Sequence, residues 1–143
     1  IPADMQDKPY YEDVVAEVRS YLERAVRRAE ASGISPDRIV LDPGIGFGKR
    51  LEDNLDLIAS LAEIAAPDYP VLVGLSRKSF IGALTNREAE GRLAGTLAAN
   101  AMAITAGARI LRVHDVEANV DLVRVMAAIS AAAISARADG RKG

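Results

Sequence analysis

Two cations and two hydroxyls follow directly after an apolar run in the segment VLVGLSRKSF, residues 71–80. The run ends at Ser76, and Arg77, Lys78 and Ser79 come next without a gap. A core has no use for such a cluster, whereas Arg77 or Lys78 can neutralise a carboxylate or phosphate. Ser79 falls near a helix start, where backbone amides attract anions. We interpret the segment as an anion-binding site; the alternative is a basic, solvated loop.

A carboxylate followed by glycines stands in LDPGIGFGK, residues 41–49. In one interpretation Asp42 only caps backbone amides in a turn. In the other it accepts hydrogen bonds from a ligand with paired N–H donors, and the glycines permit close approach. The segment Gly44-Ile45-Gly46 resembles the beginning of a dinucleotide fingerprint, but the third glycine is misplaced and Pro43 leads in. We therefore give a Rossmann site little weight.

A third polar cluster closes the segment RILRV, residues 109–113. Arg112 and His114 point to the same side of an extended chain and can clamp an anion. His114 is the only histidine and cysteine is absent, so a catalytic zinc site is not predicted. Asp115 is interpreted as a helix cap. No nucleophile–base–acid triad is recognisable, and the pattern favours electrostatic stabilisation of a transferring anion.

The composition predicts one globular domain covering residues 1–143, because 50% of the residues are hydrophobic. A net charge of −2 and 4% aromatic residues argue against nucleic acid as a partner. We expect no membrane segment, because no apolar run approaches the ~20 residues that a spanning helix needs. We also expect a cytoplasmic location. The chain does not start with Met, and we expect it to begin midway through something larger.

Helices and short strands alternate in the hydrophobic pattern. Strand ends fall at Asp42, Ser76 and His114, where the three polar clusters stand. This indicates an α/β fold with a parallel sheet, either an open doubly wound sheet or part of a (β/α)₈ barrel, and both place function at the carboxyl ends of strands. The expected helices are 14–29, 55–65, 92–106 and 116–135, Gly33 caps the first, and the strands are 38–41, 70–75 and 109–113. The helix 92–106 is small and apolar enough to suggest heavy burial.

Four motifs in order, LDPGIGFGK, VLVGLSRKSFIG, RLAGT and RVHDV, together with MQDKP near the start, resemble the C-terminal half of the dihydropteroate synthase family. The resemblance covers essentially the whole chain. It implies the C-terminal part of a (β/α)₈ TIM barrel, with about three strand–helix units and a preceding helix. It also implies a transferase of folate biosynthesis, a sulfonamide target, that joins 6-hydroxymethyl-7,8-dihydropterin pyrophosphate to 4-aminobenzoate and releases pyrophosphate.

The resemblance assigns the pterin to three side chains. Asp42 would bind its amino and ring N–H groups, and Lys78 would contact its carbonyl and ring nitrogen near Gly74. Arg112 would lie against the pterin face and, with His114, grip the leaving pyrophosphate. Lys78, Arg112 and His114 are therefore the expected catalytic residues.

The resemblance assigns 4-aminobenzoate to the other side of the same loop. Ser79 would hold its carboxylate, and Phe47 and Arg77 would flank that pocket. Loss of pyrophosphate to a pterin cation would precede attack by the amine. Mg²⁺ is the implied cofactor, although its asparagine ligand belongs to a part of the family that these residues do not cover, and no metal ligand is predicted here.

Two departures from the family pattern qualify this reading. Asp4 stands where the family carries a histidine, and a complete barrel runs to ~250 residues. We expect a fragment, a processed chain or an engineered half-barrel that lacks full synthase activity and forms a homodimer or associates with the missing half. A pterin-dependent corrinoid methyltransferase is one alternative, although it has no carboxylate for SRKS to hold. A non-catalytic half-barrel scaffold is the other.

Overall fold

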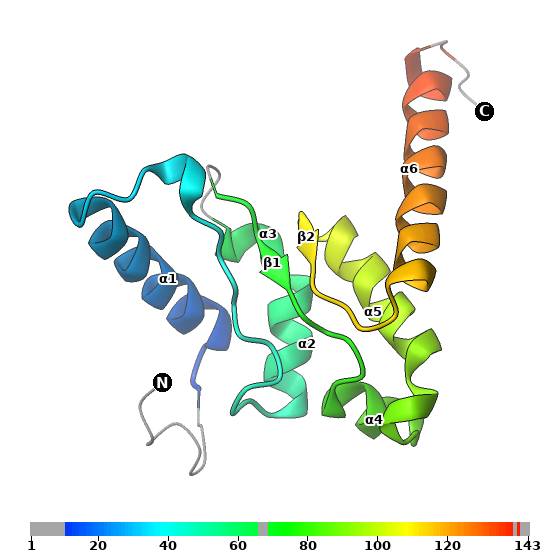
Figure 1. The fold of residues 1–143 in the computed structure, drawn as a ribbon, viewed down its shortest axis with the longest axis horizontal. Coiled ribbons are helices and arrows are strands. Elements are labelled where there is room, and N and C mark those ends of the chain that lie inside the picture. The colour runs from blue at the N-terminus through cyan, green and yellow to red at the C-terminus, as the bar shows by residue number, and fades with distance from the viewer. Residues whose placement is uncertain (1–10, 66–68, 139, 141–143) are drawn as a thin grey trace.

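Extended segments and helices alternate along the computed structural model, which describes residues 11–65, 69–138 and 140 (Figure 1). The expectation for Asp4 lies outside the described residues. The helices are α1 (Val14–Ala31), α2 (Leu51–Ala59), α3 (Leu61–Ile64), α4 (Ser79–Thr85), α5 (Leu93–Thr105) and α6 (Val116–Ala138), and 3-10 turns cover Pro36–Arg38 and Ala89–Gly91. The strands are β1 (Leu72–Val73) and β2 (Ile110–Leu111).

Helix α1 follows the predicted spacing of apolar residues. Asp13 begins it, because its carboxylate accepts a hydrogen bond from the Ala16 N–H at 3.0 Å. Gly33 lies just past its end with φ +87°, a left-handed conformation that glycine adopts without steric cost. One face of the helix is buried and consists of Val14, Val18, Leu22 and Val26.

Three parallel segments pair in chain order. Leu41 bridges to Val71, and β1 then pairs with β2 through Leu72 with Ile110 and Val73 with Leu111. Parallel neighbours need a crossover connection. Helices α2 and α3 provide the first crossover, and α4 and α5 provide the second. The predicted parallel sheet is confirmed, and its three segments end at the same edge.

The helices also pack against one another in chain order. Helix α1 contacts α2 and α3, α2 contacts α4 and α5, and α5 contacts α6. Figure 1 shows the same succession across the molecule. The described residues therefore contain no reversal of strand order, the feature that marks the ligand crevice of a doubly wound sheet.

The core lies between the segment around β1 and the helices α1, α2 and α3. Its most deeply buried side chains are at most 2% exposed. Burying such side chains is the main favourable contribution to folding. Most of them come from the loop before α2, from α2 and α3, and from the segment around β1: Ile45, Leu57, Leu61, Ile64, Val71, Val73 and Leu75. Ile81 of α4 and Ala103 of α5 complete the hydrophobic set.

Several expected elements differ from the structure. The strands 70–75 and 109–113 are reduced to β1 and β2, and helix α4 was not among the expected helices. The strand 38–41 is reduced to the bridge at Leu41, and a 3-10 turn over residues 36–38 engages the Ile39 N–H, which donates to the Pro36 carbonyl. The single helix 55–65 begins earlier, at Leu51, and is interrupted at Ser60. The helix 92–106 is not heavily buried, since within α5 only Thr96, Asn100 and Ala103 are buried.

Helix α6 extends away from the rest of the chain (Figure 1). Asn119 is the only buried residue among its 23. By length and composition it could cross a membrane, with a mean hydropathy of 1.4 over its most apolar stretch, and no other helix in the described part of the chain qualifies. This corrects the expectation that no such run exists. One helix of this kind is weak evidence for a membrane protein, because core helices of soluble proteins pass the same test.

Candidate active site

The glycine loop after Leu41 orients Asp42. One carboxylate oxygen accepts a hydrogen bond from the Gly44 N–H at 2.9 Å, so the backbone-capping interaction is present. The other oxygen lies 3.6 Å from an Arg112 guanidinium nitrogen, across the sheet edge. The Asp42 side chain remains 38% exposed and faces a cation from the third parallel segment. Both interpretations of this residue are therefore compatible with its position.

Lys78 reaches back from the second parallel segment to the glycine loop. Its ammonium donates a hydrogen bond to the Ile45 carbonyl and lies 4.4 Å from the centre of the Phe47 ring. Gly46 makes this path possible. A Cβ at Gly46 would lie 2.6 Å from Lys78 Cδ, and its φ of +87° also favours glycine. The loop and the lysine thus form one packed unit.

Arg112 crosses over Gly74 in the same way. A Cβ at Gly74 would lie 2.7 Å from Arg112 Nη2 and 3.0 Å from its Nε. The guanidinium therefore lies against bare backbone at the end of β1, beside the carboxylate of Asp42. The resemblance assigns both Gly74 and Arg112 to the pterin, and the two residues are in contact here.

His114 is held by a serine from the neighbouring segment. Its Nδ1 lies 2.8 Å from Ser76 Oγ, and its backbone N–H donates to the same oxygen at 3.3 Å. Ser76 is buried, whereas the histidine is exposed. The serine therefore fixes the imidazole at the mouth of the site.

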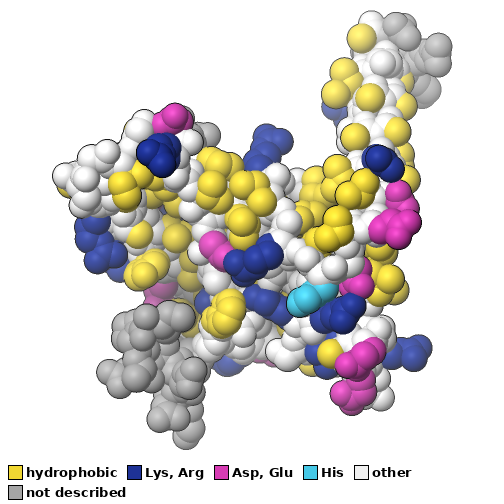
Figure 2. Space-filling view, viewed as in Figure 1, with side chains coloured by type: hydrophobic (Ala, Val, Ile, Leu, Met, Phe, Trp, Pro, Cys, Tyr) yellow, Lys and Arg dark blue, Asp and Glu magenta, His cyan; other side chains and the backbone are white. Residues whose placement is uncertain are grey.

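A hollow of about 140 Å³ lies at the sheet edge between Lys78, Arg112 and His114. Figure 2 shows Lys and Arg side chains gathered in the middle of this face, beside the histidine and below a hydrophobic surface. The hollow is lined by Gly74, Ser76, Lys78, Arg112, Val113 and His114.

Burial and neighbouring cations change the protonation of the lysines here. Burial lowers the pKa of Lys78 below its usual 10.5; Asp42 opposes this, and Arg112 and Lys49 lower it further. Burial also lowers the pKa of Lys49, against the attraction of Asp42 and Asp53. Lys49, Lys78 and Arg112 thus all interact electrostatically with Asp42, and the excess of positive charge favours a ligand with negative charge.

Four predicted residues, Asp42, Phe47, Arg77 and Ser79, do not line this hollow. Asp42 and Phe47 contact its lining residues Arg112 and Lys78. Arg77 turns away and pairs with Asp115, with nitrogen–oxygen distances of 2.7 and 3.2 Å. The carboxylate of Asp115, expected to cap a helix, is thus engaged by Arg77, and these hydrogen bonds lower its pKa. Ser79 is exposed as the first residue of α4, one residue beyond Lys78.

Sequence reasoning missed Lys49 as a member of the site. It is half-buried and donates hydrogen bonds to the Gly44 carbonyl at 2.8 Å and the Phe47 carbonyl at 3.2 Å. Its presence at the end of the quoted glycine motif was the available signal. Ser76 was noted only as part of the SRKS cluster, because a serine that contacts a histidine 38 positions later leaves no local pattern.

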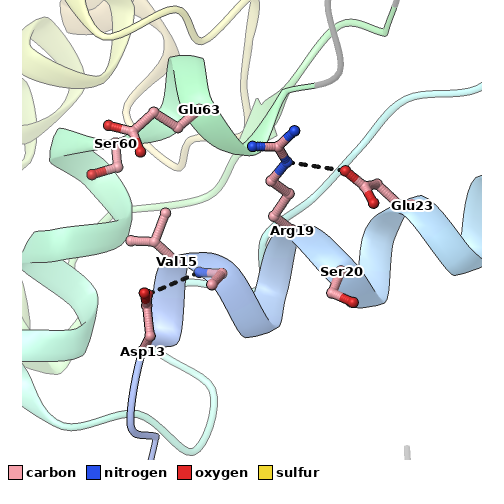
Figure 3. Close-up of a pocket in the computed structure, with 8 residues that line it drawn as sticks. Asp13, Val15, Arg19, Ser20, Glu23, Ser60 and Glu63 are labelled. Atoms are coloured by element: carbon pink, nitrogen blue, oxygen red, sulfur yellow. Dashed lines mark hydrogen bonds and ion pairs between the residues drawn. The ribbon is translucent and has the colours of Figure 1, made fainter.

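Another hollow, about 570 Å³, lies between α1 and the beginning of α3 and shares no lining residue with the hollow at the sheet edge (Figure 3). Its charged residues include Arg19, which pairs with Glu23 of the same helix at 3.0 Å, and the helix cap Asp13. We therefore attribute its polarity to helix stabilisation. Among the described residues no group of three or more His, Cys, Asp or Glu side chains could hold a metal ion.

Residues 1–114 match the family model described as pterin binding enzyme. Since the match covers most of the chain, the chain belongs to the pterin-binding enzyme family. Within it, similarity extends to dihydropteroate synthases. That of Escherichia coli (strain K12) is 47% identical over 127 residues, which are 89% of this chain and 45% of that protein. That of Neisseria meningitidis serogroup C is 46% identical over 131 residues, covering 90% and 46%.

Solved structures give the same picture. Dihydropteroate synthase of Xanthomonas albilineans in complex with 7,8-dihydropteroate has a TM-score of 0.85 at 48% identity, covering 88% of this chain and 50% of that one. The Yersinia pestis enzyme with a sulfonamide drug complex has a TM-score of 0.86 at 39% identity, covering 92% and 48%. The chain spans about half the length of the relatives it matches.

Proposed function

We propose that this chain carries the substrate-binding half of a dihydropteroate synthase and forms the C-terminal part of a (β/α)₈ barrel. The chain-ordered parallel segments and the single succession of helices support the barrel. The similarity to dihydropteroate synthases over about 90% of the chain supports the activity. The reaction would join 6-hydroxymethyl-7,8-dihydropterin pyrophosphate to 4-aminobenzoate.

One observation carries the proposal: Asp42, Lys78 and Arg112 follow three different parallel segments and lie close together. A guanidinium nitrogen of Arg112 lies 3.6 Å from a carboxylate oxygen of Asp42. Both residues lie near enough to Lys78 to change the pKa of its ammonium. A carboxylate that accepts N–H donors beside two cations suits a pterin ring that bears a pyrophosphate. A solvated loop would not need this convergence.

The resemblance implies a division of labour in the reaction, and the positions of these side chains support it. Asp42 would accept the pterin amino and ring N–H groups, and Lys78 would donate to its carbonyl and ring nitrogen over Gly74. Arg112 and His114 would stabilise the negative charge that develops as the carbon–oxygen bond to pyrophosphate breaks. The amine of 4-aminobenzoate would then attack the methylene carbon and lose a proton.

The second substrate would bind next to this position. Ser79 would donate a hydrogen bond to the 4-aminobenzoate carboxylate, and Phe47, 61% exposed, would flank its ring. A solved dihydropteroate synthase of Xanthomonas albilineans binds 4-aminobenzoic acid, with a TM-score of 0.86 to this chain at 48% identity, covering 92% of this chain and 47% of that one. Arg77 would border the pocket and take part only through its backbone turn, because its guanidinium is bound to Asp115.

Further parts of the proposal rest on the resemblance alone. Mg²⁺ would be held by an asparagine outside these 143 residues; the donor set described here does not fit a metal, and no step is derived through the ion. A cytoplasmic location is likewise proposed from the resemblance to dihydropteroate synthases. We also propose a homodimer or association with the other half of the barrel, since α5 and α6 expose Met102, Val123 and Ile129.

Isothermal titration calorimetry tests the site directly. We expect the chain to bind the pterin pyrophosphate first and 4-aminobenzoate afterwards. Arg112→Met should weaken pterin binding by at least about tenfold, whereas Arg109→Met, an exposed arginine of the same segment, should leave it within about twofold. Pterin binding without 4-aminobenzoate would favour a corrinoid methyltransferase, and no binding would favour a scaffold. Equal effects of the two substitutions would contradict the site.

A further inference from the structure

The peptide that precedes Lys78 and Ser79 adopts an unusual conformation. Arg77 has a φ of +58°, in the left-handed region that residues with a side chain rarely occupy. Lys78 then returns to an extended conformation, and Ser79 begins α4. The direction of both ligand-binding side chains is thus set by one turn at Arg77, and such a turn persists only where its surroundings hold it.

Two side chains at the beginning of α5 hydrogen-bond to the backbone N–H and the backbone carbonyl of Arg77. The Arg77 N–H donates to Thr96 Oγ1 at 3.0 Å, and the Arg77 carbonyl accepts from Arg92 Nη1 at 2.8 Å. Thr96 is completely buried. Arg92 is fixed in turn, because its Nε donates to the Arg87 carbonyl at 2.8 Å.

The path of Arg92 depends on a glycine in α4. A Cβ at Gly82 would lie 2.4 Å from Arg92 Nη2 and 2.6 Å from its Cζ. Only glycine leaves room for the guanidinium to cross the helix and reach the Arg77 carbonyl. Thr96, Arg92 and Gly82 therefore form one arrangement around a single strained peptide.

We propose that Thr96, with Arg92, is a positioning residue of the site. It holds the left-handed turn at Arg77 and thereby aims Lys78 at the glycine loop and places Ser79 at the start of α4. This inference rests on the proposed function, because it assigns Lys78 and Ser79 to ligands. Thr96 itself acts only through the Arg77 backbone.

The chain offers matched variants of Thr96. Thr96→Val removes the acceptor while keeping the shape, and Thr96→Ser restores it. Thr105→Val is the control, because Thr105 lies on the same helix and its hydroxyl donates only to the Ala101 carbonyl of its own helix. Arg92→Gln is a second test of the same turn, in case the valine variant does not fold. Circular dichroism establishes folding of each variant.

Hydrogen exchange of the amides of residues 77–79 is the first measurement. Thr96→Val should raise it about tenfold, while Thr96→Ser and Thr105→Val should stay within about twofold of the unmodified chain. Calorimetry with the pterin pyrophosphate is the second measurement. The valine variant should bind about tenfold more weakly, and the serine variant should recover most of the affinity.

The outcomes separate this inference from the proposed function. Unchanged exchange in a folded Thr96→Val chain overturns the role of Thr96, and so does faster exchange with unchanged affinity. If the unmodified chain does not bind the pterin pyrophosphate, the proposed function fails for this chain. The exchange data then still decide whether Thr96 holds the turn.

Discussion

The contact between Gly74 and Arg112 allows the proposed site to be perturbed without disturbing the core. Gly74→Ala places a methyl group 2.7 Å from Arg112 Nη2 and 3.2 Å from its Cζ, closer than van der Waals contact permits. The backbone of Gly74 lies outside the left-handed region, so alanine fits its conformation. The Arg112 side chain is 59% exposed and flexible, and we expect the guanidinium to move rather than the strand.

The magnitudes of the two effects differ. Stability should change by no more than about 1 kcal/mol, since alanine at a compatible glycine position restricts the unfolded chain and the clash is relieved at the surface. Losing an arginine that lies over the ligand ring or donates to its pyrophosphate should cost about 1–2 kcal/mol of binding. That corresponds to a roughly five- to thirtyfold weaker affinity for the pterin pyrophosphate.

Calorimetry and urea unfolding of the same preparations measure both quantities. Gly91→Ala is the control, because its nearest neighbour, Arg87 Cδ, would lie 3.6 Å from the new Cβ, an ordinary contact. Binding by the Gly74→Ala chain as tight as that of the unmodified chain would refute the reasoning. A loss of several kcal/mol of stability would refute it too, since it would mean that the strand and not Arg112 gives way.

The remaining predictions concern the fold and its assembly. Leu61→Ala should lower the free energy of unfolding by about 2–5 kcal/mol, because this side chain is 0% exposed, and Leu84→Ala, at 57% exposed, should lower it by less than about 1 kcal/mol in urea titrations. Hydrogen bonds from its arginine partner lower the pKa of Asp115 below the usual 3.8, so its stabilisation is present above that value and is lost as the pH falls through the folded pKa. Unfolding curves of Asp115→Asn should therefore differ from those of the unmodified chain at pH 7 and converge with them in acid, whereas Asp121→Asn, whose arginine lies 3.8 Å away on an exposed surface, should differ little at any pH. Met102→Glu should weaken self-association about tenfold or more in sedimentation velocity, since Met102 is 62% exposed in an apolar groove between α2, α4 and α5, and a charge there must be desolvated; an unchanged sedimentation coefficient would argue against that interface.

Elements with a repeating pattern were predictable from the sequence. Helix α1 was predictable because its buried residues recur every four positions and Gly33 follows its end. Both signals are local, within one or two helical turns of the residues they describe. The division of α2 from α3 at Ser60 was not predictable, since the apolar spacing continues across it. Nor was the loss of the strand 38–41, where the 3-10 turn at Pro36–Arg38 takes up the beginning and only Leu41 pairs.

Most members of the site were predictable, with Lys49 missed, but not all of its contacts were. Strand ends located Asp42, Lys78 and Arg112, because parallel segments end at one edge. The pairing of Arg77 with Asp115 joins residues 38 positions apart, and no local rule places an arginine in a left-handed turn. Such contacts depend on how helices pack, which composition and periodicity do not specify.

The ammonium of Lys78 already has an acceptor in the carbonyl of Ile45. Any incoming molecule that recruits this lysine must compete with the protein's own backbone, so affinity here measures the difference between two acceptors. Three glycines with positive φ follow one another at alternate positions in that loop, at 44, 46 and 48. A ligand that displaces the Ile45 carbonyl from Lys78 therefore frees the glycine loop 44–48 to rearrange. Ligand binding and the conformation of this loop then form one coupled equilibrium.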